Sequence, residues 1–310
     1  MANIAFIGLG NMGGPMSANL VRAGHQVRGF DLSPAAVEAA AQLGVTPASS
    51  PAEAVEGAEA VVTMLPKGEH AAAAYLGTEG APGVIDLVAP GTLLIDSSTI
   101  DVETSARLHE AAAAKGLPFV DAPVSGGMSG AQAGTLTFMV GGQPDAVAAA
   151  TPLLEPMAGN VIPTGGPTTG EAAKICNNMM LFISMMAAQE GAVLARRLGL
   201  DAKVFHDIAR VSSGESWAMR TWYPVPGITD TAGSNNGFAA TFSADLAAKD
   251  AGLALAGAAS VGLSLPAAEL VAGQLRRALE EGEGDKDCTI IIRQIDPEAP
   301  GLPARPEEQA

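Results

Sequence analysis

The sequence predicts an N-terminal α/β domain with a doubly wound sheet and an all-helical C-terminal domain, joined by a long helix. Three observations support this fold class. Short apolar runs alternate with Ala-rich stretches through the first half of the 310 residues. A glycine-rich turn directly follows the first apolar run. After Gly170 the strand-like runs end and long helical patterns take over, so the chain changes there from α/β to all-α.

The first half has the alternation that is typical of a parallel sheet with helices on both faces. The expected strands cover residues 3–9, 26–31, 60–65, 92–98, 118–123, 135–142 and 160–166. The expected helices cover residues 11–23, 34–43, 68–76 and 101–115. Gly24 and Gly44 provide the stop signals of the first two helices. We assign residues 1–163 to this domain.

The second half is expected to be helical over residues 171–198, 201–212, 243–260 and 266–281, with a loop rich in Gly, Pro and Asn over 221–237. The first of these helices joins the domains and is the most apolar part of the chain. Its run MMLFISMMAA is about half as long as a bilayer span, so we expect a buried core helix. Residues 164–296 form a predicted substrate and dimerisation domain. The tail over 297–310, rich in proline and charge, is predicted to be disordered.

Composition excludes several classes of partner. The chain has 17 Lys and Arg against 33 Asp and Glu, a formal net charge of −16. Phosphate binding needs clusters of Lys and Arg, so we expect neither a nucleic acid nor an anionic membrane as partner. The two cysteines make no disulfide framework, and the four histidines lack metal-ligand spacing, so no metal is expected. The N-terminus does not resemble a signal peptide, which favours a cytoplasmic protein.

The motif G-x-G-x-x-G occurs as GLGNMG, which comprises Gly8, Leu9, Gly10, Asn11, Met12 and Gly13. Alone it is a weak signal, since glycine-rich turns are common. Here it directly follows an apolar strand and opens a helix, and Asp31 ends the second strand 21 residues after Gly10. Glycines in this setting let the backbone approach a pyrophosphate, whose charge lies at the helix N-terminus. We therefore predict a Rossmann-type dinucleotide site.

Asp31 also indicates which dinucleotide binds. A carboxylate at this position accepts hydrogen bonds from ribose hydroxyls and repels a 2′-phosphate. No Lys or Arg occurs from Leu32 to Pro66 that could hold such a phosphate. The sequence therefore favours NAD over NADP.

Two further segments are candidates for the chemistry. The stretch DAPVSGG (121–127) follows the fifth strand, at the carboxyl edge where doubly wound sheets bind ligands. Its Ser125, Gly126 and Gly127 offer a hydroxyl and accessible N–H groups that suit a carboxylate. An ordinary turn explains these residues equally well, since Gly and Ser are common in turns.

Lys174 and Asn178 are four residues apart on a predicted helix, so they share a face. A lysine near a helix start is usually a solvated surface group. Here Leu181 and Met185 continue the same face, so we expect it to point inward. A partly desolvated lysine exchanges a proton near neutral pH more readily, as general acid–base catalysis requires.

Several segments in order carry a family resemblance: FIGLGNMGGPMSANL, DSSTID, DAPVSGGMSGAQAGTLTFMVGG, GEAAKICNN, PVPG and AAKDAGLA. Together they resemble the β-hydroxyacid dehydrogenases, over about residues 3–292. The resemblance implies that Lys174 is the catalytic acid/base, that Asn178 holds the substrate, and that Ser125–Gly127 binds its carboxylate. It also implies cofactor contacts for Leu65 and Pro66 at the adenosine, Thr99 at the nicotinamide ribose, and Lys249 from the helical domain. For Lys249 an ion pair with Asp245 or Asp250 is the alternative, and for Trp217 and Phe238 core packing is as compatible as covering the site.

The activity implied by the resemblance is NAD-dependent oxidation of a short 3-hydroxy acid, with 3-hydroxyisobutyrate of valine breakdown expected first. L-Serine, 3-hydroxypropionate and tartronate semialdehyde or D-glycerate are alternative substrates. A sugar phosphate is disfavoured because no Arg/Lys cluster would hold it, and an imine substrate because Lys174 is present. A non-catalytic NAD-binding module is the rival from another class.

The resemblance also implies a homodimer or homotetramer. The sequence departs from the family pattern at His70, Tyr223 and Cys288. The change at Tyr223 bears on which substrate is preferred.

Overall fold

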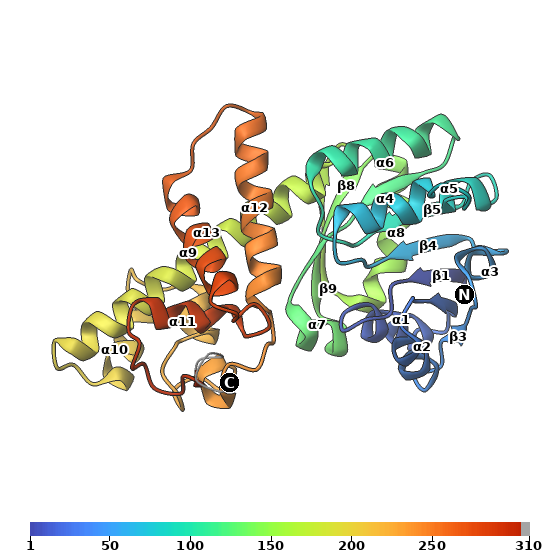
Figure 1. Ribbon diagram of the computed structural model, residues 1–310. Helices are drawn as coiled ribbons and strands as arrows, with labels where there is room; N and C mark the ends of the chain where they lie inside the picture. The colour runs from blue at the N-terminus through green and yellow to red at the C-terminus, as the bar shows by residue number, and fades with distance from the viewer. Residues whose placement is uncertain (305–310) are drawn as a thin grey trace. The chain divides into compact units, whose positions relative to one another are not determined.

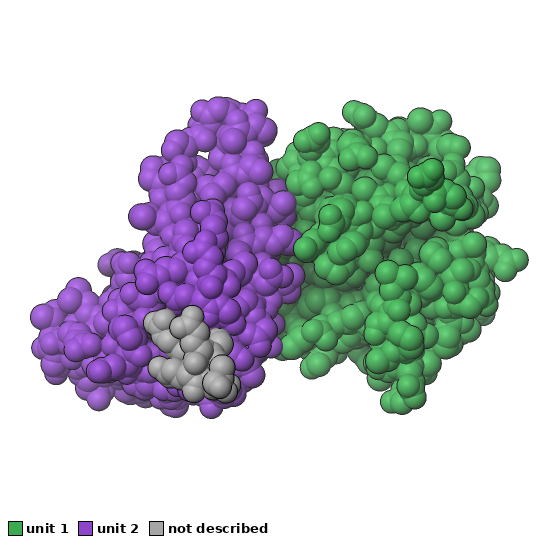
Figure 2. All heavy atoms as spheres, viewed as in Figure 1, with its two compact units in different colours: residues 1–174 green, residues 175–310 purple. Residues whose placement is uncertain are grey.

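The structure is a computed structural model that describes residues 1–304 (Figure 1). The chain divides into two compact units, residues 1–174 and a second unit that begins at Ile175 (Figure 2). The first unit contains the sheet and the second is helical, so the predicted fold class is confirmed. The division lies inside the long helix α9 (Thr169–Arg197), directly after Lys174. The boundary proposed from the sequence, at residue 163, lies before this helix.

Within the described residues, nine strands form one sheet in the first unit. They are β1 (Asn3–Ile7), β2 (Gln26–Phe30), β3 (Thr46–Pro47), β4 (Ala60–Thr63), β5 (Leu93–Asp96), β6 (Phe119–Asp121), β7 (Val124–Ser125), β8 (Leu136–Gly142) and β9 (Ala158–Gly165). The order β3-β2-β1-β4-β5-β6 is parallel throughout. The direction of winding reverses between β1 and β4, and in such sheets ligands bind outside the carboxyl ends of the strands at this point.

Helices cover both faces of the sheet (Figure 1). They are α1 (Gly13–Arg22), α2 (Pro34–Ala41), α3 (Pro51–Val55), α4 (Gly68–Leu76), α5 (Val84–Leu87), α6 (Val102–Ala114), α7 (Gly127–Ala133), α8 (Pro144–Leu154) and the 3₁₀ helix η1 (Glu155–Met157). Side chains of α1, α2, α7 and α8 share one apolar core with the sheet, and those of α3 to α6 share the other.

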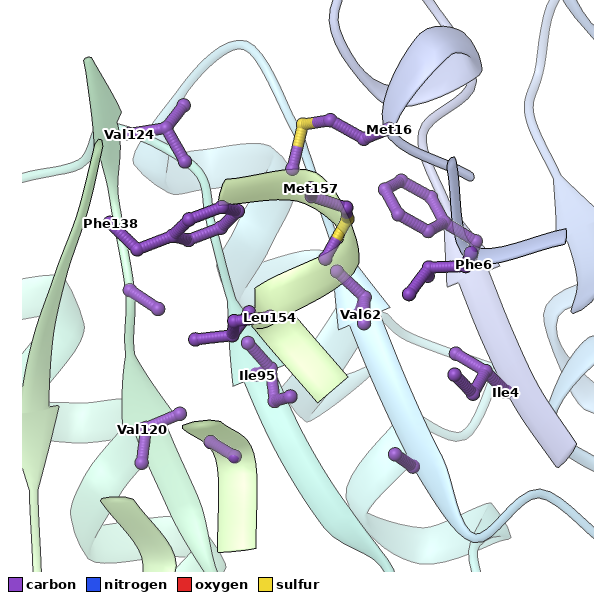
Figure 3. Close-up of a cluster of buried hydrophobic side chains, with 14 of the residues drawn as sticks. Ile4, Phe6, Met16, Val62, Ile95, Val120, Val124, Phe138, Leu154 and Met157 are labelled. Atoms are coloured by element: carbon purple, nitrogen blue, oxygen red, sulfur yellow. The ribbon is translucent and has the colours of Figure 1, made fainter. Parts of the chain in front are cut away.

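The strands supply alternate residues to these two cores. In β1, Ile4 and Phe6 point to one face and Ala5 and Ile7 to the other, as the period of two requires. Figure 3 shows the first core, where Phe6, Met16 and Phe138 lie among aliphatic side chains from the strands and from α8. Because both faces are covered, the strands read as continuous apolar runs in the sequence.

The sheet differs from the prediction beyond β6. The sequence pattern indicated parallel strands throughout, but β8 is antiparallel to β6 and to the two-residue β7. Between β7 and β8 the chain forms the short helix α7, which ends at Gly134 in a left-handed conformation (φ 68°) and returns the chain alongside β7. Neither α7 nor α8 was among the expected helices.

The second unit packs its helices around one apolar core. Its elements are the greater part of α9, then α10 (Ala202–Ala209), α11 (Trp217–Thr221), η2 (Gly233–Asn236), α12 (Ala244–Ser260), α13 (Pro266–Glu280) and η3 (Cys288–Gln294). The core includes Phe182 and Met185 of α9, and Phe182 stacks on Phe242 at 6.0 Å between ring centroids. Phe238 is fully buried in this core, as its core-packing alternative predicts, whereas Trp217 stays partly exposed.

By length and composition alone, α9 is the one helix of the described residues that could cross a membrane, with a mean hydropathy of 1.2 over its most apolar window. Core helices of soluble proteins meet the same criterion. Phe182, Met185, Ala188 and Ala192 of α9 all lie in the core of the second unit. These residues make α9 a core helix of the second unit, as the sequence predicted.

The predicted disordered tail is corrected in part. Residues 297–304 pack on the helical unit: Ala299 is buried, Leu302 lies against the core, and Arg293 Nη2 donates to the Pro303 carbonyl at 2.7 Å. Arg197 Nη2 also pairs with Asp296 Oδ1 at 3.1 Å, just before this segment. Composition misled here because a few apolar contacts and hydrogen bonds suffice to order a proline-rich strip. Residues 305–310 lie outside the described part of the chain.

The core of the first unit generates a stability prediction. Phe138 of β8 is fully buried, so Phe138→Ala removes apolar contacts and leaves a cavity, and should lower the free energy of unfolding by about 3–5 kcal/mol. Leu43→Ala is the matched control, because Leu43 is 49% exposed. Urea unfolding of the full chain measures both. Equal effects of the two substitutions would contradict the packing described here.

Candidate active site

In the glycine turn after β1, two of the three glycines occupy positions where a side chain would clash with the backbone. Gly8 has φ +94°, and a Cβ there would lie 2.3 Å from the Met64 carbonyl oxygen. A Cβ on Gly13, the first residue of α1, would lie 1.8 Å from the Gly8 carbonyl oxygen. A Cβ on Gly10, in contrast, would meet no described atom within 4 Å. The turn is therefore tight at its ends and open in the middle, as a pyrophosphate approaching the backbone needs.

Asp31 lies beside this turn, directly after β2. Its Oδ2 accepts the Leu9 N–H at 2.7 Å and its Oδ1 accepts the Ser33 N–H at 2.7 Å. The carboxylate is thus held at the glycine turn by backbone donors and remains partly exposed. These residues fit a dinucleotide whose pyrophosphate lies over Gly10 at the start of α1 and whose ribose hydroxyls face Asp31.

A buried hydrogen-bond network joins the ends of β4 and β5. Asp96 Oδ1 accepts the Thr63 hydroxyl at 2.7 Å and the Ser98 hydroxyl at 2.6 Å, and Ser98 Oγ accepts the Leu65 N–H at 2.9 Å. The network therefore holds two loops together, the one with Leu65 and Pro66 and the one with Thr99. Burial raises the pKa of the Asp96 carboxyl above its ordinary value, although the hydroxyls of Ser98 and Thr63 act in the opposite direction.

Ser125, Gly126 and Gly127 form the turn between β7 and α7. Ser125 pairs with Thr137 of β8, and the two glycines adopt φ 134° and 63°, which other residues rarely adopt. Both glycines are exposed, and a Cβ on Gly127 would meet no described atom within 4 Å. The segment is a turn and its backbone is accessible, so both interpretations made from the sequence fit this geometry. Its role in holding a carboxylate stays a prediction.

Lys174 and Asn178 lie one turn apart on α9, and both are buried, at 8% and 3% exposure. Of the two residues expected to continue this face, Met185 is fully buried and Leu181 is partly buried against the same core, and Phe182 beside them is fully buried. The expectation that this face points inward is therefore confirmed. A buried lysine is rare among protein side chains, which makes the position unusual for a merely solubilising charge.

The second unit holds a cluster of three polar side chains, Asn178, Lys249 and Asp250, of which the sequence predicted the first two as site residues. Asn178 Nδ2 donates to Asp250 Oδ2 at 2.7 Å, and Lys249 Nζ lies 3.0 Å from Asp250 Oδ1. Lys249 thus makes the ion pair named as its alternative, and its contact with the cofactor stays a prediction. Asp250, which is 4% exposed, was not among the predicted site residues. The sequence signal was an acidic residue inside the Ala-rich stretch AAKDAGLA, and the structure shows that this residue is buried on α12.

The three departures from the family pattern have separate settings. Tyr223 is fully buried in the helical core, its hydroxyl donates to the Ala202 carbonyl at 3.2 Å, and burial raises its pKa to about 12. Cys288 is also buried there, 3.7 Å from the Met185 sulfur, and burial raises the pKa of its thiol well above the ordinary value. His70 lies exposed on α4. Two of the three departures therefore lie in the apolar core of the helical unit.

Two family models together match most of the chain. One, described as the NAD binding domain of 6-phosphogluconate dehydrogenase, matches residues 3–166. The other, described as NAD-binding of NADP-dependent 3-hydroxyisobutyrate dehydrogenase, matches residues 168–295. The two matches meet at the start of α9, and each covers one of the two predicted domains.

Individual relatives are similar over nearly the whole length. The 3-hydroxyisobutyrate dehydrogenase of Pseudomonas aeruginosa is 48% identical over 266 residues, 86% of this chain and 88% of that protein. The NAD-dependent L-serine dehydrogenase of the same organism is 41% identical over 297 residues, 96% of this chain and 99% of that protein. A solved structure of Mycobacterium tuberculosis 3-hydroxyisobutyrate dehydrogenase with L-serine has a TM-score of 0.89 at 44% identity, covering 96% of this chain and 99% of that one.

The glycine turn generates a paired prediction. Gly13→Ala forces a methyl against the Gly8 carbonyl and should lower the free energy of unfolding by about 1–3 kcal/mol. Gly10→Ala meets no described atom, so it should leave stability nearly unchanged while weakening NADH binding, because the methyl fills the space that the pyrophosphate needs. Urea unfolding and NADH fluorescence titration separate the two effects. Gly10→Ala with undiminished NADH affinity would contradict this assignment of the turn.

The raised pKa of Asp96 generates a pH prediction. Below the pKa of the unfolded carboxyl its contribution to stability is fully present, and it is lost as pH rises through the higher folded pKa. Asp96→Asn keeps an acceptor for Thr63 and Ser98 but cannot ionise. The unfolding free energy of the variant relative to wild type should therefore increase as the pH rises from below the ordinary Asp pKa of about 4 through the higher folded pKa. Urea unfolding across this range tests it, and a difference that is constant with pH would rule it out.

Proposed function

The chain belongs to the β-hydroxyacid dehydrogenase family and is an NAD-binding oxidoreductase, and we propose that it oxidises 3-hydroxyisobutyrate to methylmalonate semialdehyde. The observation that carries the proposal is Lys174, a buried lysine at the start of α9 in the first unit, the unit that also contains the glycine turn. The 48% identity to a protein named 3-hydroxyisobutyrate dehydrogenase supports the choice of substrate.

The residues predicted to bind and activate the substrate have the following roles in this reaction. When bound, NAD accepts the hydride. The Ser125–Gly127 turn binds the substrate carboxylate through its exposed N–H groups and hydroxyl. Lys174 takes the proton of the substrate hydroxyl as general base. Asp250 accepts one N–H of the Asn178 amide and so orients it, and the second N–H of that amide is available to the substrate.

NAD rather than NADP is the proposed cofactor because of Asp31. The carboxylate is held at the glycine turn by the Leu9 and Ser33 amides, where it suits ribose hydroxyls and repels a 2′-phosphate. The family model whose description mentions NADP matches residues 168–295, a range that does not include this turn.

L-Serine is the second candidate substrate. One relative at 41% identity is named an NAD-dependent L-serine dehydrogenase, and the similar Mycobacterium tuberculosis structure was solved with L-serine. L-Serine is also a 3-hydroxy acid, and it differs from 3-hydroxyisobutyrate by an ammonium group in place of a methyl. The same carboxylate turn and the same base would serve both substrates, so the group beside the carboxylate decides between them.

The setting of the enzyme follows from the proposed substrate. Oxidation of 3-hydroxyisobutyrate belongs to valine catabolism, and we place it in the cytoplasm. We infer a homodimer or homotetramer, because Val204, Ile208 and Val211 form an exposed apolar row along α10 and its end. The proposed partner is a small hydroxy acid, and the net charge of −16 argues against nucleic acid and anionic membranes as partners.

The substrate is tested by initial rates with NAD and with NADP on 3-hydroxyisobutyrate, L-serine, 3-hydroxypropionate and D-glycerate. The highest kcat/KM is expected for 3-hydroxyisobutyrate with NAD. A higher value for L-serine would replace the first candidate by the second. NADH binding without turnover of any of these acids would favour the non-catalytic module.

The base is tested by Lys174→Ala, which should lower kcat by about 10²–10⁴-fold, the usual range for a positioned acid–base group. NADH affinity, measured by fluorescence, should stay close to that of wild type. Lys115→Ala is the control, since Lys115 is an exposed lysine of the same unit, paired with Asp86 at 2.8 Å. Near wild-type turnover of Lys174→Ala would remove the proposed mechanism.

A further inference from the structure

The first turn of α9 is pressed against the ends of β6 and β8. A Cβ on Gly170 would lie 2.5 Å from the carbonyl oxygens of both Asp121 and Met139. A Cβ on Gly141, near the end of β8, would lie 2.6 Å from the Gly170 nitrogen. The two glycines thus permit backbone-to-backbone contact between the helix start and the sheet, which any side chain would prevent.

Asp121, the last residue of β6, binds the amides of this turn. Its Oδ1 accepts the Thr168 N–H at 3.0 Å and its Oδ2 accepts the Glu171 N–H at 2.9 Å. The side chain is 1% exposed. N-terminal N–H groups of a helix have no partner within the helix. Here a carboxylate 47 and 50 residues earlier in the sequence accepts two of them. Its negative charge is also favourable at the positive end of the helix dipole.

His109 of α6 holds Asp121 from a third element. Its Nε2 lies 2.7 Å from Asp121 Oδ1, and we assign the hydrogen of this bond to Nε2 because both Asp121 oxygens already accept backbone N–H groups. The imidazole is itself fixed by an edge contact with Phe119 at 4.7 Å between ring centroids. Asp121 thus makes three hydrogen bonds, which leaves its carboxylate a single orientation.

We propose that Asp121 and His109 are positioning residues for Lys174, which follows Glu171 by three residues on α9. The inference rests on the proposed role of Lys174 as the base. Neither residue is assigned a contact with substrate or cofactor. They determine the position of the Lys174 amine by holding the start of α9 against the sheet. A displacement of a catalytic group by about 1 Å can cost about 10²-fold in rate, so loosening this turn should be visible in catalysis.

Glu171 adds a second tie in the same turn. Its side chain is fully buried, and its Oε2 accepts the Ile100 N–H at 3.2 Å. Ile100 follows Thr99, the residue expected beside the nicotinamide ribose. The turn that precedes Lys174 is therefore joined to β6, to β8 and to the loop after β5, all within the first unit.

The test compares Asp121→Asn, His109→Leu and His109→Gln in the full chain. Asp121→Asn loses an acceptor, and His109→Leu loses the donor to it, so each should lower kcat about 10- to 100-fold. KM for NAD should stay within about twofold, because Asp121 and His109 lie outside the glycine turn. His109→Gln keeps an N–H near the Nε2 position and should restore most of kcat.

Two further measurements separate positioning from general destabilisation. Hydrogen–deuterium exchange should rise over residues 168–174 in Asp121→Asn and His109→Leu more than elsewhere in the first unit. Ser50→Ala is the matched control, since Ser50 caps α3 of the same unit through the Glu53 N–H at 3.1 Å and that helix carries no proposed site residue. It should leave kcat unchanged.

Wild-type kcat in both Asp121→Asn and His109→Leu, while Lys174→Ala is inactive, would overturn the positioning role and leave the proposed function intact. Should Asp121→Asn fail to fold, as judged by thermal unfolding and NADH binding, the His109 pair decides. Equal losses in His109→Leu and His109→Gln would contradict the inference, and rescue by glutamine alone would support it. An active Lys174→Ala would instead refute the proposed function itself.

Discussion

The arrangement of the first unit depends on the hydrogen-bond partners of the backbone N–H groups at the start of α9, where this helix meets the sheet. A helix N-terminus leaves amides without partners, and burying them unpaired would cost about 1–3 kcal/mol each. Asp121 at the end of β6 accepts two of these N–H groups, and His109 and the glycines at 141 and 170 make that arrangement possible. The same contact places Lys174 at the boundary of the first unit.

Pairs of glycines allow close backbone contact between a helix start and the sheet at two places near strand ends. At the turn after β1, Gly8 and Gly13 allow α1 to begin directly on the strand, while Gly10 leaves the backbone open. At the other, Gly141 and Gly170 allow α9 to begin on β6 and β8. In both cases a helix start faces the carboxyl edge of the sheet, which is where such sheets bind ligands. The fold and the proposed chemistry therefore both depend on helix starts that glycines allow to lie close to the carboxyl edge of the sheet.

Three buried polar side chains inside α9 have defined hydrogen-bond partners. Glu171 Oε2 accepts the Ile100 amide, Asn178 donates to Asp250, and Gln189 Nε2 donates to the Thr289 carbonyl at 2.7 Å. Buried polar groups are costly when unpaired and give a unique arrangement when paired. The helix reads as apolar in composition, yet these hydrogen bonds join it to Ile100 in the first unit and to Asp250 and Thr289 in the second.

Local patterns in the sequence determined much of this protein. Apolar runs and stop signals located most strands and the long helices, the glycine motif with Asp31 indicated the dinucleotide turn, and spacing placed Lys174 and Asn178 on one inward face. Tertiary structure alone decided the antiparallel β8, the ordering of residues 297–304, and the partners Asp121, His109 and Asp250. These features depend on contacts between residues far apart in the chain, such as the 72 positions that separate Asn178 from Asp250. Periodicity and propensity report only on near neighbours, so they cannot reveal which distant carboxylate will meet a given amide.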